Sequence, residues 1–240
     1  MAIPQAGRVQ SGILMDIGRP VLFDCGSGVL NRILESGHAP MDIDTIVLTH
    51  LHLDHVADVL SLLKANWLCD RNEATLYGPV GTQAWMAGLL DVYGYMQGKL
   101  NLELIEVAPG ESFTPEGCDC EITSAAGVHS VPSLGYRVEY GGRSVVYSGD
   151  TEPCPAIMKL AEDADVLIHE CSFPLGFEVD CHTTPDMLAG YLERYVHPGR
   201  VYLTHLYPHM QGHESEALRY LQDRFDIEVQ IATDLLVVDV

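Results

Sequence analysis

The stretch Thr49-His50-Leu51-His52-Leu53-Asp54-His55 places four side chains that can bind a metal within six residues. It joins residues 43–48, an apolar run that predicts a buried strand, to residues 55–68, whose apolar side chains recur at helical spacing. Imidazole and carboxylate groups are the usual ligands of zinc and similar divalent ions. Because such groups are costly to place beside a buried strand without a partner, the stretch predicts a metal site in a loop between a strand and a helix.

The spacing within this stretch allows it to serve two ions. His50 and His52 are two residues apart, so both can point the same way from an extended loop. Asp54 and His55 come where the helix begins and can face a second position. Three other candidates follow predicted strands, and they are His129, Asp150 and His205. Loops after strands often carry function, but each of these three, taken alone, fits an ordinary polar residue in a turn equally well.

The charge and composition narrow the class of protein. The chain has 240 residues, with 34 acidic and 13 basic side chains and a formal charge of −21. This charge disfavours an extended nucleic acid as partner, because like charges repel at long range. No apolar run approaches the length of about 18 residues that a membrane span needs, and residues 1–9 lack the pattern of a signal peptide. Seven cysteines without a Cys-x-x-Cys pair favour reduced thiols and a cytoplasmic location.

Strand and helix patterns alternate along the chain, with no repeat, low-complexity tract or linker. This predicts one α/β domain over residues 1–240 with a layered architecture. Residues 185–195 predict a helix with Thr184 as its N-cap. Residues 228–232 and 235–240 are expected to form the closing strands.

The candidate residues fall into five segments, which in chain order are Phe23-Asp24-Cys25-Gly26, residues 50–55, His129, Ser148-Gly149-Asp150-Thr151 and His205. Together they resemble the motifs of the metallo-β-lactamase superfamily, in the branch that holds ribonuclease Z-like enzymes and small phosphodiesterases. The resemblance implies a four-layer αβ/βα sandwich, in which two sheets face each other, helices lie outside and the metals sit at one edge. It also implies that Asp24 orders the metal-binding loop.

The resemblance further implies a complete ligand set for two divalent ions. The implied ligands of one ion are His50, His52 and His129. Those of the other ion are Asp54, His55 and His205, and Asp150 would bridge the two ions. Zinc is the favoured metal, while manganese and iron also suit nitrogen and oxygen ligands.

Two further segments resemble the catalytic part of ribonuclease Z-like enzymes. Residues 167–173 resemble their His-Glu-Ala-Thr-Phe segment, and Cys181-His182-Thr183-Thr184 resembles their Gly-His-Ser-Thr segment. The resemblance implies that His182 protonates the leaving group, with Glu170 as a candidate orienting partner, while Asp54 would both ligate a metal and orient the nucleophile. The alternatives are a helix-capping loop in which His182 is incidental and a salt-bridged surface position for Glu170.

The chain departs from ribonuclease Z in the part that grips RNA. Ribonuclease Z carries a long insertion between its third and fourth motifs, whereas here only residues 130–149 separate them, which is enough for little more than a hairpin. With the acidic charge, this disfavours cleavage of transfer RNA at its 3′ end. The usual opening Gly-Thr-Gly strand is also missing, so the start is either truncated or remodelled. Weaker candidates to line the pocket are Tyr136, Tyr207, His209 and His213. The role of His169 stays open.

The resulting hypothesis is a phosphodiesterase that uses a hydroxide between two metals on a small anionic phosphodiester, of the cyclic nucleotide or cyclic ribose phosphate class. The main alternative is cleavage of a lactone, thioester or aryl sulfate by the same hydroxide. A redox role is disfavoured because diiron relatives typically have glutamate where His52 stands. A binding protein with a vestigial site is disfavoured by the complete ligand set. Relatives are commonly dimers, which favours a homodimer.

Overall fold

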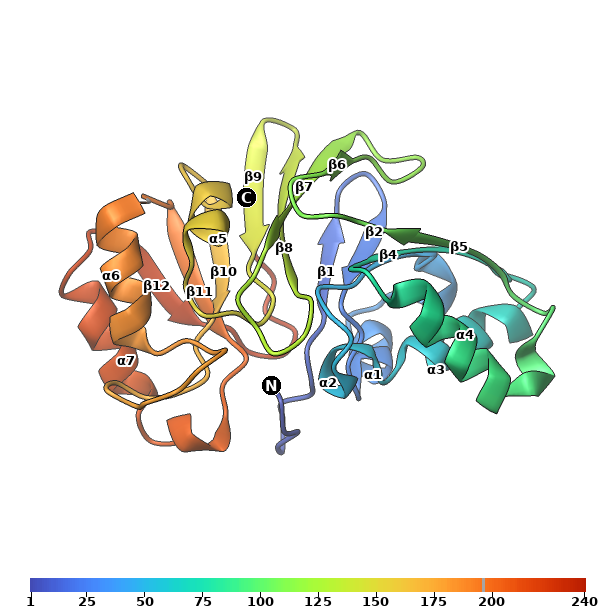
Figure 1. Cartoon of the computed structure of the whole chain (residues 1–240), viewed down its shortest axis with the longest axis horizontal. Coiled ribbons are helices and arrows are strands. Elements are labelled where there is room, and N and C mark those ends of the chain that lie inside the picture. The colour runs from blue at the N-terminus through green and yellow to red at the C-terminus, as the bar shows by residue number, and fades with distance from the viewer. Residues whose placement is uncertain (196) are drawn as a thin grey trace.

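A computed structural model of the chain describes residues 1–195 and 197–240. Two sheets form its centre (Figure 1). The strands of the first sheet, in spatial order, are β1 (Ile13–Asp16), β2 (Pro20–Phe23), β3 (Thr45–Val47), β4 (Glu73–Gly78) and β5 (Asn101–Glu106). The hairpin of β1 and β2 is antiparallel, and the pairs from β2 to β5 are parallel. The residues at the carboxyl ends of these parallel strands therefore lie at one edge of the sheet.

The second sheet is larger and continues the same arrangement. Its strands, in spatial order, are β12 (Glu228–Ile231), β11 (Arg200–Thr204), β10 (Val166–Glu170), β9 (Arg143–Tyr147), β8 (Leu134–Tyr140), β7 (Cys120–Ala126) and β6 (Ser112–Phe113). The strands from β12 to β9 are parallel, and those from β9 to β6 are antiparallel. The carboxyl ends of its parallel strands again lie at a single edge of the sheet.

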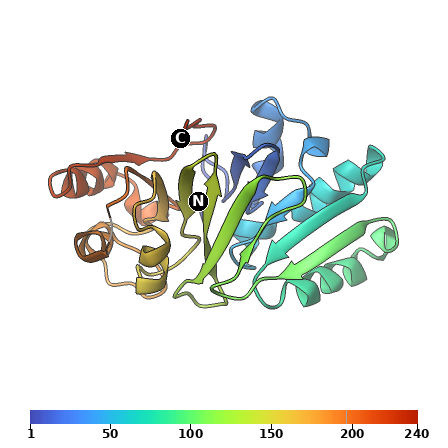
Figure 2. The same ribbon diagram turned by 90° about the horizontal axis from the view of Figure 1, so that it is seen from above.

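Helices cover the outer face of each sheet, as the family resemblance implies. The helices of the first half are α1 (Val29–Glu35), the short α2 (Leu53–Val56), α3 (Val59–Leu68) and α4 (Thr82–Val92), with the 3₁₀ turns η1 (Pro40–Asp42) and η2 (Gly94–Met96). Those of the second half are α5 (Pro155–Leu160), α6 (Pro185–Tyr195) and α7 (Glu214–Gln222), with η3 (Pro208–Met210). The two helix groups lie at opposite ends of the molecule, with the strands between them (Figures 1 and 2).

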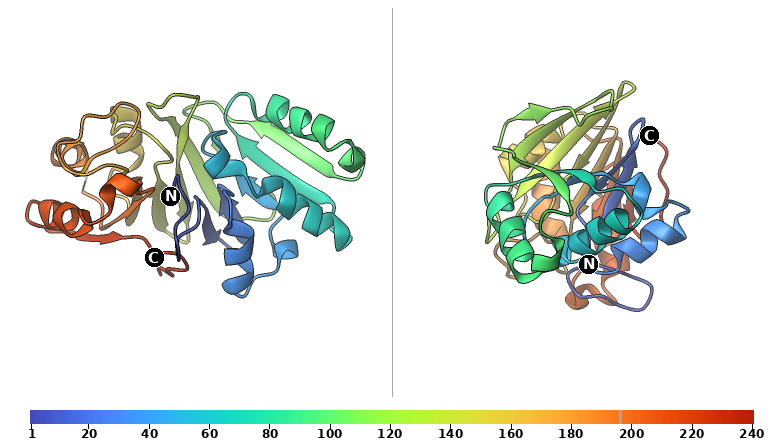
Figure 3. Two further views of the ribbon diagram at one scale, coloured as in Figure 1. Left: turned by 90° about the horizontal axis from the view of Figure 1, so that it is seen from below. Right: turned by 90° about the vertical axis from the view of Figure 1, so that its right-hand side faces the viewer.

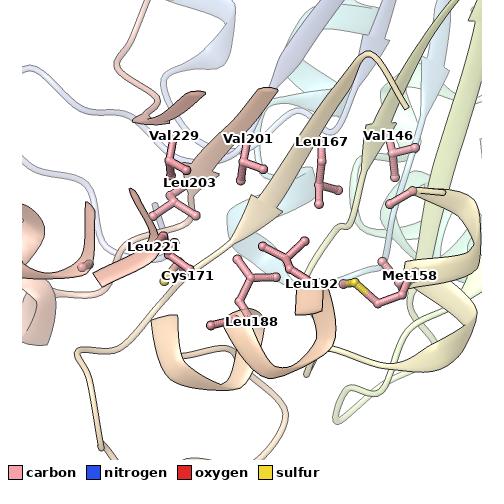
Figure 4. Close-up of a cluster of buried hydrophobic side chains, with 14 of the residues drawn as sticks. Val146, Met158, Leu167, Cys171, Leu188, Leu192, Val201, Leu203, Leu221 and Val229 are labelled. Atoms are coloured by element: carbon pink, nitrogen blue, oxygen red, sulfur yellow. The ribbon is translucent and has the colours of Figure 1, made fainter. Parts of the chain in front are cut away.

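Three apolar layers hold these elements together. One layer lies between the sheets and contains Phe23, Val47, Ile122, Tyr136 and Tyr147 among its buried members. A second joins the first sheet to its helices. The third joins the second sheet to α5, α6 and α7, where side chains of parallel strands meet those of the helices (Figure 4). The order helix, sheet, sheet, helix confirms the expected four-layer αβ/βα sandwich.

The expected helix at residues 55–68 is divided in two, into α2 and α3. The division falls at Asp58, whose carboxylate accepts hydrogen bonds from the backbone amides of Gly28 and Leu30 at the start of α1, at 2.8 and 3.1 Å. Asp58 therefore fixes the first turn of α1. It also separates α2 from α3, so the two helices need not share one axis. Figure 3, seen from below, looks onto the edge of the molecule where α2 lies.

Near the end of the chain, the structure confirms the predicted N-cap of a helix but not the predicted last strand. Thr184 is the N-cap of α6, since its Oγ1 accepts a hydrogen bond from the amide of Met187 at 3.4 Å. The strand predicted at residues 235–240 is wrong. A turn closed by the hydrogen bond from the amide of Leu236 to the carbonyl of Thr233 directs these residues away from the sheet. Most of their apolar side chains are exposed, so nothing pairs with them among the described residues.

The segment between His129 and Asp150 is a tight hairpin, as its length predicts. Strands β8 and β9 pair along their length and are joined at Gly141 and Gly142, which both have positive φ angles of 59° and 78°. Only glycine adopts this conformation freely at two successive positions. None of the helices in the described part of the chain has the length and apolar character that a bilayer span needs.

Candidate metal centre

Three imidazoles converge where the first sheet meets the second. His50 and His52 come from the loop after β3, and His129 comes from the loop after β7. The Nδ1 atom of His52 lies 3.1 Å from Nε2 of His50 and 3.1 Å from Nε2 of His129. His129 is distant in sequence from the other two histidines. The hydrogen bond from the amide of Leu134 to the carbonyl of Thr49, at 2.9 Å, holds the two segments next to each other.

A second cluster lies beside the first and contains Asp54, His55, Asp150 and His205. Nε2 of His205 is 3.3 Å from Nε2 of His55, 3.2 Å from Oδ2 of Asp54 and 3.2 Å from Oδ2 of Asp150. Oδ1 of Asp150 is 3.3 Å from Nε2 of His55. Oδ2 of Asp150 is also 3.8 Å from Nε2 of His50 in the first cluster. Asp150 therefore faces both clusters.

These distances fit bound metal ions. Ligand atoms about 2.0–2.1 Å from a tetrahedral zinc ion are roughly 3.3 Å from one another, which is close to the separations in both clusters. Oδ1 of Asp150 is buried and has no hydrogen-bond partner among the described residues, although a buried carboxylate oxygen normally has one. A cation between Asp150, His55 and His205 would supply the missing partner.

Asp24 holds the loop that carries most of these groups. Its carboxylate accepts hydrogen bonds from the backbone amide of Thr49 at 2.8 Å, from Nδ1 of His55 at 2.7 Å and from the hydroxyl of Tyr147 at 2.9 Å. The backbone of Asp24 has a φ angle of 57°, which an L-residue adopts only where its surroundings require it. These hydrogen bonds explain how Asp24 orders the metal-binding loop, as the family resemblance implies.

The imidazoles of both clusters are oriented through their other nitrogen. Nδ1 of His50 lies 3.0 Å from Oγ1 of Thr49, and Nδ1 of His129 donates to the carbonyl of Cys181 at 2.8 Å. Nδ1 of His205 lies 3.1 Å from Oγ of Ser172. Such outer partners fix the tautomer and the direction of a metal ligand. The sequence pattern did not predict Thr49, Ser172 or Cys181 as partners, although each is next to a motif residue.

Two glycines allow the motif segments to pack closely. A Cβ atom on Gly26 would lie 2.0 Å from the backbone oxygen of Asp54, so the first motif rests directly on the metal-binding loop. Gly149 has a φ angle of 60°, and a Cβ there would lie 2.8 Å from Cβ of Thr49. Both positions require glycine because the neighbouring atoms are backbone or a buried side chain.

The protonation states of His50 and Asp150 suit metal binding, whereas that of His55 must change when a metal binds. Burial, and then the neighbouring imidazoles, hold the pKa of His50 well below its usual value. Burial would raise the pKa of Asp150, but the charges of His205 and His55 hold it well below its usual value. Burial would lower the pKa of His55, but Asp150 and Asp24 raise it well above its usual value. Metal binding at His55 therefore displaces a proton.

Glu170 and His182 lie beside the clusters. Oε1 of Glu170 accepts hydrogen bonds from Nδ1 of His182 and from the amide of Thr151, both at 2.8 Å. Its Oε2 accepts from the hydroxyl of Ser172 at 2.7 Å and from the amide of Thr183 at 3.1 Å. Glu170 is fully buried, so the alternative of a surface salt bridge is wrong. Burial would lower the pKa of His182, but the hydrogen bond and charge of Glu170 raise it.

The remaining candidates lie in different places. Tyr207 is at the site, with its hydroxyl 3.4 Å from Nε2 of His182, and burial raises the pKa of Tyr207 to about 12. His209 packs on an aromatic cluster beside it. Tyr136 does not line the site, because it is fully buried and donates to the carbonyl of Leu48. His213 is exposed and lies 3.3 Å from Glu216 on the surface. The weaker expectations for Tyr136 and His213 were therefore wrong.

His169 is buried on β10 and belongs to none of the clusters of potential metal ligands among the described residues. Its Nδ1 donates to the carbonyl of Glu170 at 2.7 Å, and its Nε2 has no partner among the described residues. Burial lowers the pKa of His169, so the ring is neutral.

An αβ/βα sandwich with adjoining histidine and aspartate clusters at one edge defines a metal-dependent hydrolase. Residues 19–206 match the Beta-lactamase superfamily domain, so the chain belongs to the metallo-β-lactamase superfamily, in its ribonuclease Z-like branch. A curated relative, Ribonuclease Z of Mycobacterium avium, is 30% identical over an alignment that covers 97% of this chain and 92% of the relative.

Solved structures show the same fold. The metallo-beta-lactamase fold protein YhfI of Bacillus subtilis is 27% identical, with a TM-score of 0.80 over 96% of this chain and 92% of that one. A diphosphatase of the PhnP family is 21% identical, with a TM-score of 0.74 over 97% of this chain and 85% of that one. At this identity, the second likeness shows the fold alone.

Proposed function

We propose that this chain is a phosphodiesterase that hydrolyses a small anionic phosphodiester. The observation that carries the proposal is the position of the Glu170–His182 pair directly beside two clusters of potential metal ligands, both of which Asp150 faces. A partly buried acid next to the metal-ligand clusters suits a poor leaving group such as an alkoxide, which must be protonated as it departs.

The proposed site binds two divalent ions, of which zinc suits the nitrogen-rich ligands and short separations best. The proposed ligands are His50, His52 and His129 for one ion, Asp54, His55 and His205 for the other, and Asp150 for both. When bound, the ion pair supplies an activated water as nucleophile and positive charge for the phosphoryl oxygens.

The side chains of this chain then have separate roles. Asp54 is 17% exposed and faces the site, where its free oxygen orients the attacking water. Nε2 of His182 carries the proton that passes to the leaving oxygen, while its Nδ1–H stays bonded to Glu170. The charge of Glu170 keeps His182 protonated to a higher pH than an isolated imidazole would be.

The hairpin of β8 and β9 and the charge of −21 support a small substrate over transfer RNA. No arm extends from this hairpin to grip an RNA, and an acidic surface repels a phosphate backbone. The seven cysteines are free, which supports a reducing compartment such as the cytoplasm.

The test is a substrate panel with metal-loaded protein. We expect turnover of bis(p-nitrophenyl) phosphate and of 2′,3′-cyclic nucleotides, loss of turnover with a chelator, and recovery on addition of zinc. His50→Ala should lose activity and bound metal, while His213→Ala, an exposed histidine outside the site, should keep both. Turnover of lactones, thioesters or aryl sulfates without phosphodiesters would overturn the proposal, and so would cleavage of transfer RNA alone.

A further inference from the structure

Four rings from two loops form a continuous aromatic wall next to the metal centre. The wall consists of Phe173 and Phe177 from the loop after β10, Tyr207 from the loop after β11 and His209 from η3, which follows that loop. Phe173 is stacked between the other two large rings, with centroids 4.7 Å from Phe177 and 4.8 Å from Tyr207 and interplanar angles of 17° and 27°. His209 contacts both phenylalanines. The stack therefore holds its members in fixed orientations.

One end of the wall reaches the acid of the site. The hydroxyl of Tyr207 is 3.4 Å from Nε2 of His182, and its ring centroid is 5.2 Å from that of His182 and 5.7 Å from that of His205. A leaving oxygen that receives its proton from His182 must therefore lie next to Tyr207. The group attached to that oxygen would extend along the aromatic wall.

The other end of the wall is open to solvent. Phe173 is only 7% exposed, but Phe177 is 39% exposed, and His209 is also exposed. Within the described residues, the lysines and arginines that lie over aromatic rings lie over Tyr95, Tyr195 and Tyr220, and none lies over a ring of the wall. The wall thus offers ring faces and no fixed cation, which suits an uncharged planar group and not a second phosphate.

We propose that the aromatic wall is a subsite for a planar ring attached to the alcohol of the substrate. The substrate class is then a phosphodiester whose alcohol carries a nucleobase or an aryl ring, in preference to a sugar phosphate without one. This rests on the proposed phosphodiesterase function and names which of its substrates the site favours. Stacking on aromatic side chains accepts any base, because every base has a π-face.

The test compares three substrates with the same scissile bond. These are adenosine 2′,3′-cyclic phosphate, phenyl β-ribofuranoside 2,3-cyclic phosphate and methyl β-ribofuranoside 2,3-cyclic phosphate. We expect kcat/KM to be roughly tenfold higher for a ring-bearing substrate than for the methyl riboside. A preference for adenosine over phenyl identifies a nucleobase as the ring, and equal values identify a general aryl subsite. Equal kcat/KM for all three would overturn the proposal.

The variant Phe177→Ala removes the exposed ring, while Tyr93→Ala removes a ring that is 45% exposed on another part of the surface. Phe177→Ala should lower kcat/KM for the ring-bearing substrates about tenfold through KM, with little change for the methyl riboside. Tyr93→Ala should change none of them. A uniform loss on all three substrates with Phe177→Ala would show a structural role and contradict the subsite.

A binding measurement separates this inference from the proposed function. Saturation-transfer NMR with adenosine, which contains no ester, should show contact of the base protons with the protein and loss of that contact in Phe177→Ala. If no phosphodiester is hydrolysed but adenosine binds in this way, the proposed function fails and the ring subsite stands. If phosphodiesters are hydrolysed and adenosine makes no such contact, the subsite is wrong and the function stands.

Discussion

The two halves of the sandwich contribute to the site in different ways. The first half supplies Asp24 from one loop and places its metal-binding side chains, with their partner Thr49, within residues 49–55. The second half supplies groups from several separate places, namely the last residue of β10 and the loops after β7, β9, β10 and β11, and these groups are His129, Asp150, Glu170, His182 and His205. In the first half a single segment determines the site, whereas in the second half the order of the strands determines it.

The comparison shows how a sheet assembles residues that are distant in sequence. Strands β9, β10 and β11 are parallel neighbours, and each delivers its functional side chain just at or after its last residue. Asp150, Glu170 and His205 therefore meet although the first and the last are 55 positions apart in the sequence. The ends of parallel strands are the usual place for such sites.

The sharpest test of this comparison is Asp150, which faces ligands from both halves. Asp150→Asn keeps the shape of the side chain but removes its charge. We expect kcat/KM for phosphodiesters to fall by roughly four orders of magnitude, or about 5 kcal/mol, because both ions lose a ligand charge. Elemental analysis should show less than the wild-type metal content.

His213→Ala serves as the matched control for Asp150→Asn, since it removes a titratable side chain from the surface. Circular dichroism should show both variants folded. If Asp150→Asn kept wild-type activity and metal content, the two clusters would not act as one site, and the proposed sharing of Asp150 would be wrong.

The same contrast explains how much the sequence could predict. The segment at residues 49–55 indicates a metal site by itself, because four potential ligands are too close together for chance. Asp150 or His205 alone indicates nothing, since aspartate after glycine is common in turns. Their place in the site came from the order of family motifs. The layered α/β class followed from alternating patterns, but the pairing of strands did not.

Some features could not be predicted because they depend on tertiary contacts. The division of the helix at Asp58 depends on the amides of α1, which its carboxylate binds. The burial of Tyr136 depends on the opposing sheet, and a tyrosine in an alternating strand pattern fits either face. The contact of Tyr207 with His182 depends on the stack of phenylalanines in a loop. No local pattern indicates any of these.

The next prediction concerns the acid in the second half. His182→Ala should lower kcat for substrates with alkoxide leaving groups by about 10²–10³-fold, within the range of general acid catalysis. The loss should be much smaller for p-nitrophenyl esters, whose leaving group is stable as an anion. Metal content should stay unchanged, because the proposed role of His182 is to protonate the leaving group and not to bind a metal. An equal loss on both kinds of ester would indicate that His182 binds metal or supports the fold.

Glu170→Gln should have a smaller effect of about 10–100-fold, typical of a group that orients an active residue. The sign of its pH effect follows from the charge. Glu170 raises the pKa of His182, so the protonated acid persists to higher pH in the wild type. Without the carboxylate that pKa falls, and the loss of kcat on the alkaline side should begin at a lower pH. An unchanged alkaline limb would contradict the role of the Glu170–His182 pair.

The smallest effect is expected at the hydrogen bond that joins the halves, from the hydroxyl of Tyr147 on β9 to Asp24 in the first half, at 2.9 Å. Tyr147→Phe should lower the free energy of unfolding by about 1–2 kcal/mol, near the low end for a bond to a charged group, because Thr49 and His55 still donate to Asp24. For a chain of this size that corresponds to a fall in Tm of roughly 2–8 °C.

Tyr140→Phe is the matched control for this last variant, since Tyr140 is 38% exposed and its hydroxyl has no partner among the described hydrogen bonds. Its Tm should stay within about 1 °C of the wild type, as expected for a surface change. Metal affinity should also weaken in Tyr147→Phe, because Asp24 directs His55. If Tyr147→Phe lost neither stability nor metal affinity, the first half would order its metal-binding loop without help from the second, and the two halves would be less dependent on each other than their shared hydrogen bond indicates.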